Sequence, residues 1–210
     1  MLKKILLLLF LLMPIASYAA TAPTTPTIMI LGDSLSAAYG IEQRAGWVHL
    51  LQQRLAQRGY RYQVVNVSIS GETTRGGLAR LAQALKTHNP NIVIVELGAK
   101  DGLRGLLLGE MQANLDAIIT QSRRRNAQVL LVGMHLPPNY GPSYTRKFHQ
   151  VYVDLAARHR VPLAPFLLEG VATDRALMQQ DGLHPTAAAQ PRVLDNVWKH
   201  LQGTLRKRNF

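Results

Sequence analysis

Residues 28–36 read Ile28-Met29-Ile30-Leu31-Gly32-Asp33-Ser34-Leu35-Ser36, an apolar run that leads directly into a glycine and a polar turn. A short continuous apolar run bounded by a turn is typical of a strand buried on both faces of a parallel sheet. A serine directly after such a strand lies at the carboxyl edge of the sheet, where ligand sites of open α/β folds are found. The stretch therefore predicts a parallel sheet and makes Ser34 a candidate nucleophile, provided that a base reaches it.

Similar apolar runs recur along the chain and alternate with segments of helical periodicity. The expected strands are Ile28–Leu31, Gln63–Val67, Asn91–Leu97, Gln128–Met134 and Val161–Pro165. The expected helices are Trp47–Arg58, Gly77–Thr87, Met111–Asn126, Tyr144–Arg160 and Thr186–Leu205, the last with Thr186 as N-cap. Strands alternating with helices imply right-handed βαβ units. The predicted fold class is α/β, a three-layer α/β/α sandwich with a five-stranded parallel sheet.

The first twenty residues have the three-part layout of a secretory signal peptide. Lys3 and Lys4 form a positive region, Ile5 to Leu12 is an apolar run, and Ser17-Tyr18-Ala19 supplies small residues for cleavage. The apolar run is too short to span a bilayer, although an uncleaved N-terminal anchor remains the alternative. We therefore expect export of the protein to the periplasm or outside the cell.

The remaining chain has a length that suits one domain. We expect a flexible lead-in over residues 21–27, a single domain over residues 28–205 and a basic tail over residues 206–210. No other segment reaches the 18 or so apolar residues of a membrane helix.

Composition excludes several classes of function. The chain of 210 residues contains no cysteine, which excludes disulfide scaffolds, thiolate metal sites and cysteine nucleophiles. The formal net charge is +12, but the basic residues are dispersed, and both local clusters (Arg123–Arg125 and Arg206–Arg208) fall at expected helix ends. We therefore expect no nucleic-acid partner and, at most, peripheral contact with an anionic membrane surface.

Nucleotide-binding motifs are also excluded. Gly71 to Leu78 has the glycine spacing of a P-loop, but Gly77 and Leu78 occupy the positions that require Lys and Ser or Thr. No glycine-rich dinucleotide motif follows the first strand. The chain also lacks the Gly-x-Ser-x-Gly elbow of the ordinary α/β-hydrolases.

A serine nucleophile needs a base, and two of the seven histidines qualify by position. His135 follows the fourth expected strand. His184 lies in Asp181-Gly182-Leu183-His184-Pro185, a loop before the last expected helix, where Asp181 could hold one imidazole nitrogen while the other accepts the serine proton. A simple turn is the alternative interpretation of this segment.

Four segments in chain order together resemble one family of enzymes. They are Gly32–Ser36, Asn66–Thr73, Gly98–Gly105 and Asp181–Pro185. Their order and sequence resemble the GDSL/SGNH hydrolases, and the similarity covers nearly all of the chain after residue 20. Two further segments, Leu136–Pro142 and Pro165–Gly170, are similar to an exported branch of thioesterases, lysophospholipases and arylesterases. The resemblance implies a flavodoxin-like fold and an enzyme that uses no metal and no organic cofactor.

Carried over position by position, the resemblance implies Ser34 as nucleophile, His184 as general base and acid, and Asp181 as the residue that orients His184. The oxyanion hole would use the backbone N–H groups of Ser34 and Gly71. The family's third donor is an Asn side chain, and here Lys100 occupies that position.

Lys100 is the main departure from the family pattern. A lysine ammonium is longer, charged and mobile, so it is a poor substitute for a short fixed amide. Three positions for the ammonium stay open: away from the oxyanion, in contact with it, or paired with Asp101 or Glu96. We expect the first, and hence a weakened hydrolase.

The leading functional hypothesis is a monomeric serine esterase that cleaves acyl esters and thioesters. Leu136, Pro137, Phe166 and Leu167, together with Leu168, are the expected contacts for the acyl chain. A carbohydrate O-acetyl esterase and a catalytically silent lipid-binding protein are the alternatives.

Overall fold

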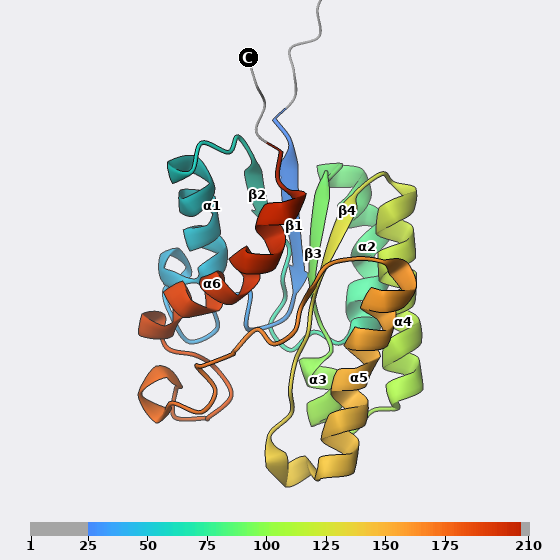
Figure 1. Cartoon of the computed structure of the whole chain (residues 1–210), viewed down its shortest axis with the longest axis vertical. Helices are drawn as coiled ribbons and strands as arrows, with labels where there is room; N and C mark the ends of the chain where they lie inside the picture. Colours follow the sequence, from blue (N-terminus) through green and yellow to red (C-terminus); the bar gives the residue numbers. More distant parts are fainter. Residues whose placement is uncertain (1–24, 207–210) are drawn as a thin grey trace, which may run out of the picture.

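The computed structural model describes residues 25–206 (Figure 1). The expected signal peptide (residues 1–20), the first part of the lead-in and all but the first residue of the basic tail lie outside the described residues. None of the helices within residues 25–206 is long and apolar enough to cross a bilayer.

The centre of the domain is the expected five-stranded parallel sheet. Its strands are β1 (Thr27–Gly32), β2 (Gln63–Asn66), β3 (Ile92–Glu96), β4 (Gln128–Val132) and β5 (Leu163–Ala164). They run parallel in the order β2-β1-β3-β4-β5, which is the flavodoxin-like order. Every residue of β1 and of β3 is buried, as expected of strands covered on both faces.

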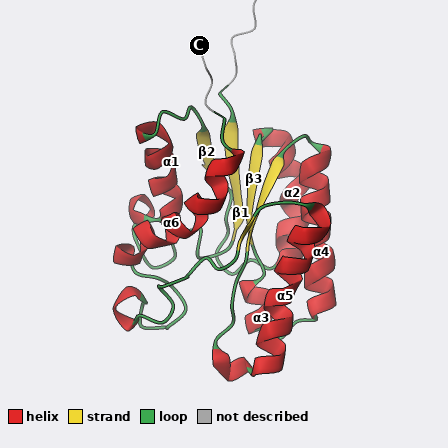
Figure 2. Cartoon of the chain, in the orientation of Figure 1, coloured by secondary structure: helices red, strands yellow, loops and turns green. Residues whose placement is uncertain are grey.

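Helices cover both faces of the sheet and confirm the three-layer prediction (Figure 2). One layer contains α1 (Trp47–Gln57) and α6 (Gln190–Leu201), which pack against each other. The other contains α2 (Thr74–His88), α4 (Leu108–Arg124) and α5 (Pro142–His159), with α4 between the other two. Helices α1, α2, α4 and α5 each return the chain from one parallel strand to the next, so the carboxyl ends of all strands meet at one edge.

Several helix boundaries differ from the sequence-based expectation. Helix α2 begins three residues before the expected Gly77, because the Thr73 side chain accepts a hydrogen bond from the N–H of Gly76 at 3.2 Å and caps the helix. The expected Thr186–Leu205 helix is wrong in extent: Thr186 makes no side-chain cap, and a 3-10 turn over Ala187–Ala189 precedes α6. Proline at the second residue of α6, Pro191, suits a helix start there.

A short helix, α3 (Ala99–Leu103), was not expected. It follows β3 after Gly98, whose φ of +115° lies in a region that favours glycine. Five residues carry too little apolar periodicity to distinguish a helix from a loop. The helix places Lys100 and Asp101 at the carboxyl edge of the sheet.

Two hydrogen bonds at fully buried aromatic residues tie the helices together and to the sheet. Trp47 lies at the start of α1, and its backbone N–H donates to Gln190 Oε1 of α6 at 2.9 Å, which joins the two helices of that layer. On the opposite face, Tyr152 of α5 donates its hydroxyl hydrogen to the carbonyl of Leu97 at 2.9 Å, just beyond β3. The bond from Tyr152 fixes α5 to the end of β3, near the site.

The close approach of β4 and β5 gives a test of the packing. A Cβ added to Gly133 would overlap the backbone carbonyl oxygen of Pro165. We expect Gly133→Ala to lower the free energy of unfolding by about 1–3 kcal/mol, as overpacking against rigid backbone does. Gly109→Ala is the matched control, because a Cβ there meets nothing within 4 Å. It should be neutral or stabilising by up to about 1 kcal/mol. Urea unfolding of both variants measures the difference, and equal effects would contradict the packing argument.

Candidate active site

The structure brings Ser34, His184 and Asp181 together at the carboxyl edge of the sheet. Ser34 follows β1 directly, whereas Asp181 and His184 belong to the loop before α6. The Nε2 atom of His184 lies 2.8 Å from Ser34 Oγ, and its Nδ1 atom lies 2.6 Å from Asp181 Oδ2. A carboxylate only accepts hydrogen bonds, so it selects the tautomer with hydrogen on Nδ1. Nε2 is then free to accept the hydroxyl hydrogen of Ser34.

Asp181 is held as a charged acceptor by its own turn. Its Oδ1 atom accepts hydrogen bonds from the N–H groups of Leu183 at 2.9 Å and His184 at 3.0 Å. Although partial burial raises the pKa of Asp181, the hydrogen bonds from the His184 side chain and from these two N–H groups lower it to about 2. The carboxylate is therefore ionised at every pH at which the protein would work.

The loop that carries His184 is tied to the loop that carries Ser34. The backbone N–H of Gln179 donates to the carbonyl of His184 at 2.7 Å, and its side-chain amide donates to the carbonyl of Tyr39 at 2.9 Å. The Tyr39 ring lies against the imidazole of His184, with ring centroids 4.5 Å apart. These contacts restrict the imidazole to the space between Ser34 and Asp181.

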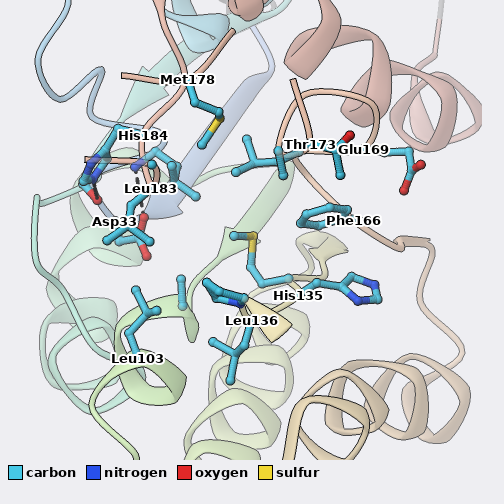
Figure 3. A pocket seen from close by; sticks show the side chains of 18 of the residues that line it. Asp33, Leu103, His135, Leu136, Phe166, Glu169, Thr173, Met178, Leu183 and His184 are labelled. Atoms are coloured by element: carbon cyan, nitrogen blue, oxygen red, sulfur yellow. Dashed lines mark hydrogen bonds between the residues drawn. The ribbon is translucent and has the colours of Figure 1, made fainter. Parts of the chain in front are cut away.

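His135, the other histidine that qualified by position, lines the same pocket as Ser34 but does not contact it (Figure 3). Its ring stacks on His149 with centroids 4.0 Å apart and meets the edge of Phe166 at 4.7 Å. Partial burial and the neighbouring His149 lower the pKa of His135. Its side chain makes no hydrogen bond to Ser34 or Asp181, all of which lie among the described residues.

A buried polar network supports the turn that carries Ser34, and the sequence interpretation did not include it. Asp33 Oδ1 accepts from the N–H of Leu35 at 3.0 Å. Glu96, at the end of β3, accepts from Ser36 Oγ at 2.6 Å and from the N–H of Asp33 at 3.3 Å through Oε2. The sequence did contain a signal for this network: a glutamate follows the apolar run Ile92–Val95. A carboxyl group at the end of a buried strand must find hydrogen-bond partners.

Two backbone N–H groups that the sequence analysis singled out have no hydrogen-bond acceptor within residues 25–206. They belong to Ser34 and Gly71, the expected oxyanion donors. Gly71 has a φ of +81°, which favours glycine. The buried Asp101 of α3 accepts from Thr74 through its N–H at 2.9 Å and its hydroxyl at 2.6 Å, and so fixes the segment after Gly71 against α3.

Lys100 lines the same pocket as Ser34 and His184. Within the described part of the chain, Lys100 forms no ion pair, so the pairing with Asp101 or Glu96 that the sequence left open is not adopted. The carboxylate of Asp101 is occupied by Thr74, and Glu96 is fully buried beneath the nucleophile turn. Lys100 is thus a half-buried residue at the wall of the pocket.

The pocket beside Ser34 has a volume of about 510 Å³, within the range of small-molecule sites (Figure 3). Three of the four expected acyl contacts, Leu136, Pro137 and Phe166, line it, and so does Leu168. The prediction that Leu167 contacts the acyl chain is wrong, because its side chain is fully buried in the core and does not line the pocket. The chain turns here, with the N–H of Glu169 donating to the carbonyl of Phe166 at 3.4 Å. Phe166 and Leu168 therefore line the pocket while Leu167 packs into the core.

The chemical groups gathered at this site are suited to acyl transfer. No group of three or more His, Asp or Glu side chains within residues 25–206 is arranged to hold a metal ion. A nucleophile, a base held in one tautomer, free N–H donors and an apolar cavity are the parts that ester hydrolysis needs.

Comparison with known proteins agrees with this chemistry. The sequence matches the GDSL-like lipase/acylhydrolase family over residues 30–191, and the chain belongs to that family. It is a hydrolase of the SGNH type with esterase function and a small-molecule ester substrate.

Individual relatives are similar over most of their length. Esterase TesA of Pseudomonas aeruginosa is 51% identical over 179 residues, which cover 85% of this chain and 89% of the relative. The thioesterase 1/protease 1/lysophospholipase L1 of Escherichia coli is 42% identical over 193 residues, covering 92% of this chain and 90% of the relative. The crystal structure of a protein named TesA superposes with a TM-score of 0.83 at 51% identity, covering 84% of this chain and 98% of that structure.

Proposed function

We propose that the protein is a serine esterase that hydrolyses acyl esters and thioesters, of the lysophospholipid, acyl-CoA and aryl ester type, through an acyl-enzyme. The observation that carries the proposal is the position of His184, which bridges Ser34 and Asp181 beside an apolar pocket. Ser34 is the nucleophile, His184 the general base and acid, and Asp181 the residue that orients the imidazole.

The proposed reaction has two halves. Ser34 Oγ attacks the acyl carbonyl carbon while its hydrogen passes to His184 Nε2, and the resulting oxyanion accepts hydrogen bonds from the N–H groups of Ser34 and Gly71. The imidazolium then gives the proton to the leaving alcohol or thiol, which leaves an ester of Ser34. Water attacks this ester with His184 again as base, and the free acid and the Ser34 hydroxyl are released.

The shape of the pocket supports acyl chains as substrates. Leu136, Pro137 and Phe166 provide an apolar wall larger than an acetyl group fills. The alternative, a carbohydrate O-acetyl esterase, would place a polar sugar against this wall. Comparing hydrolysis of a medium-chain p-nitrophenyl ester with that of an acetylated sugar distinguishes them: preference for the acetylated sugar would contradict the proposal.

The proposal extends to location and association. The charge and apolar pattern of residues 1–20 supports export to the periplasm with removal of that segment. The net charge of +12 supports at most peripheral attachment to an anionic membrane surface, and we propose a monomer.

The first prediction tests the roles of Ser34 and His184. Ser34→Ala should abolish p-nitrophenyl ester turnover and labelling by a fluorophosphonate probe, and His184→Ala should reduce turnover almost as far, since such residues act as a unit. His135→Ala is the comparison for the base, because His135 lines the same pocket but its ring stacks on His149 and makes no hydrogen bond to Ser34. It should change turnover far less than His184→Ala. A crippling effect of His135→Ala with an active His184→Ala would overturn the assignment of the base. Wild-type protein that the probe does not label would indicate a silent binder.

The second prediction concerns Lys100. We propose that its ammonium lies away from the oxyanion, which is then stabilised by two backbone donors. Lys100→Asn should raise kcat by about 10²-fold, the usual effect of one such donor. KM should change little, because the donor bonds the developing oxyanion more than the ground-state carbonyl. Steady-state kinetics of wild type, Lys100→Asn and Lys100→Met on one ester test whether the ammonium contacts the oxyanion. An unchanged or lower kcat in Lys100→Asn, with Lys100→Met lower still, would show that the ammonium itself acts as the donor.

The third prediction concerns export. Expressed in a Gram-negative bacterium, the protein should be recovered from the periplasm and be shorter by about twenty residues. Mass spectrometry of the purified protein measures the shortening, and substitution of Lys3 and Lys4 by Glu should retain precursor in the cytoplasm. Full-length protein in the membrane fraction would instead support the uncleaved anchor.

A further inference from the structure

Two carboxyl groups lie buried at the carboxyl ends of neighbouring strands, directly behind the nucleophile. Asp33 follows β1 and is 2% exposed, and Glu96 ends β3 and is fully buried. The strand register brings them together, because Gly32 pairs with Glu96 across β1 and β3. Among the described residues, neither carboxyl group forms an ion pair. The mechanism proposed above uses neither of them.

Glu96 is positioned to remain neutral. One of its oxygens accepts two hydrogen bonds, whereas the other is buried without a partner among the described residues. Burial, followed by the charge of Asp33, raises the pKa of Glu96 well above its usual value, although hydrogen bonds from Ser36 and Asp33 oppose the shift. Two adjacent carboxyl groups in a low-dielectric site cannot both ionise easily, so one of them keeps its proton.

Asp33 carries the single charge of the pair. Burial raises the pKa of Asp33 to about 6, while the N–H of Leu35 and the nearby His184 and Lys100 oppose the shift and Asp101 adds to it. The charged or titratable groups that face Asp33 are His184 from the loop before α6, Lys100 and Asp101 from α3, Glu96 from β3 and Tyr152 from α5. At neutral pH Asp33 is mainly a carboxylate.

We propose that Asp33 is a positioning residue that acts through His184, its buried carboxylate stabilising the imidazolium that forms when Ser34 gives up its proton. Asp33 and His184 line the same pocket beside Ser34, and Figure 3 shows both on one side of it. The inference rests on the proposed roles of Ser34 and His184. It adds a second negative charge to the one that Asp181 supplies.

The carboxylates of Asp181 and Asp33 differ in how strongly water screens their effect on His184. The side chain of Asp181 is 39% exposed, so water screens it, whereas that of Asp33 lies in the interior, where charges interact over longer distances. The sequence maintains this arrangement with a glycine: a Cβ on Gly32 would lie 2.8 Å from both Glu96 Oε2 and Ser36 Oγ. The small residue thus allows Glu96 to pack beneath the turn, next to Asp33.

The test compares kcat of wild type and Asp33→Asn on one p-nitrophenyl ester between pH 5 and pH 8. At pH 8 the variant should be slower by about tenfold, because the imidazolium loses a nearby buried charge, with little change in KM. As the pH falls through about 6, wild-type Asp33 gains its own proton, so the ratio of the two rates should approach one. A structural defect would instead lower the rate by the same factor at every pH.

Stability provides an independent readout with the opposite sign. Burial disfavours the charged form of Asp33, so its raised pKa stabilises the folded protein at low pH, and this contribution is lost as the pH rises from about 4 to 6. Asp33→Asn removes the buried charge and should therefore raise the melting temperature at pH 8 while it lowers kcat. A variant that is slower and also less stable at pH 8 would contradict the inference.

Three matched variants complete the experiment. Asp195→Asn removes an exposed carboxylate of α6 that binds Arg54, and its rate relative to wild type should not vary with pH. Glu96→Gln mimics the neutral form and should keep the pH dependence of wild type; loss of that dependence in Glu96→Gln would place the charge on Glu96 and overturn the inference. Fluorophosphonate labelling of Asp33→Asn should reach the same stoichiometry as wild type. If Ser34→Ala is labelled or active, the proposed function fails rather than the role of Asp33.

Discussion

The parallel pairing of β1 with β3 is the constraint on which the site depends. It runs from Ile28 opposite Ile92 to Gly32 opposite Glu96, with every side chain buried, and so fixes where both strands end. The turn after β1 presents Ser34, and the segment after β3 forms α3 with Lys100 and Asp101. A shift of this register by one residue would turn the apolar side chains to the other face, and it would separate the glycine from the carboxyl group that it accommodates.

The fold was predictable because its signals are strong and redundant. Buried parallel strands such as Ile92–Val95 are continuous apolar runs, and the alternation of strands with helices leaves few topologies. The wrong helix boundaries lie where local hydrogen bonds and turns, rather than the apolar pattern, set the start of a helix. Thr73 caps α2 earlier than the apolar stripe begins, and the segment after Thr186 winds into a 3-10 turn before α6. Helix α3 is too short for any periodic pattern.

The candidate site was predictable in part, for a different reason. Ser34, Asp181 and His184 stand in short motifs whose neighbours are recognisable, and the structure brings their side chains within hydrogen-bonding distance. Leu167 was misassigned because the sequence does not reveal that the chain turns at residues 167–170 and directs Leu167 into the core. The support provided by Glu96 and Asp33 was missed because it depends on the register of two strands more than sixty positions apart.

The distance along the chain between the groups of the site has a consequence for biosynthesis. Ser34 and His184 are 150 positions apart, and the loop that holds His184 depends on contacts such as those of Gln179 and on the packing of α6 on α1 through Trp47 and Gln190. A nascent chain with residues 181–210 still inside the ribosome exposes Ser34, the proposed nucleophile, without His184, the proposed base. With these roles, the site is latent during synthesis and is completed only when α6 docks.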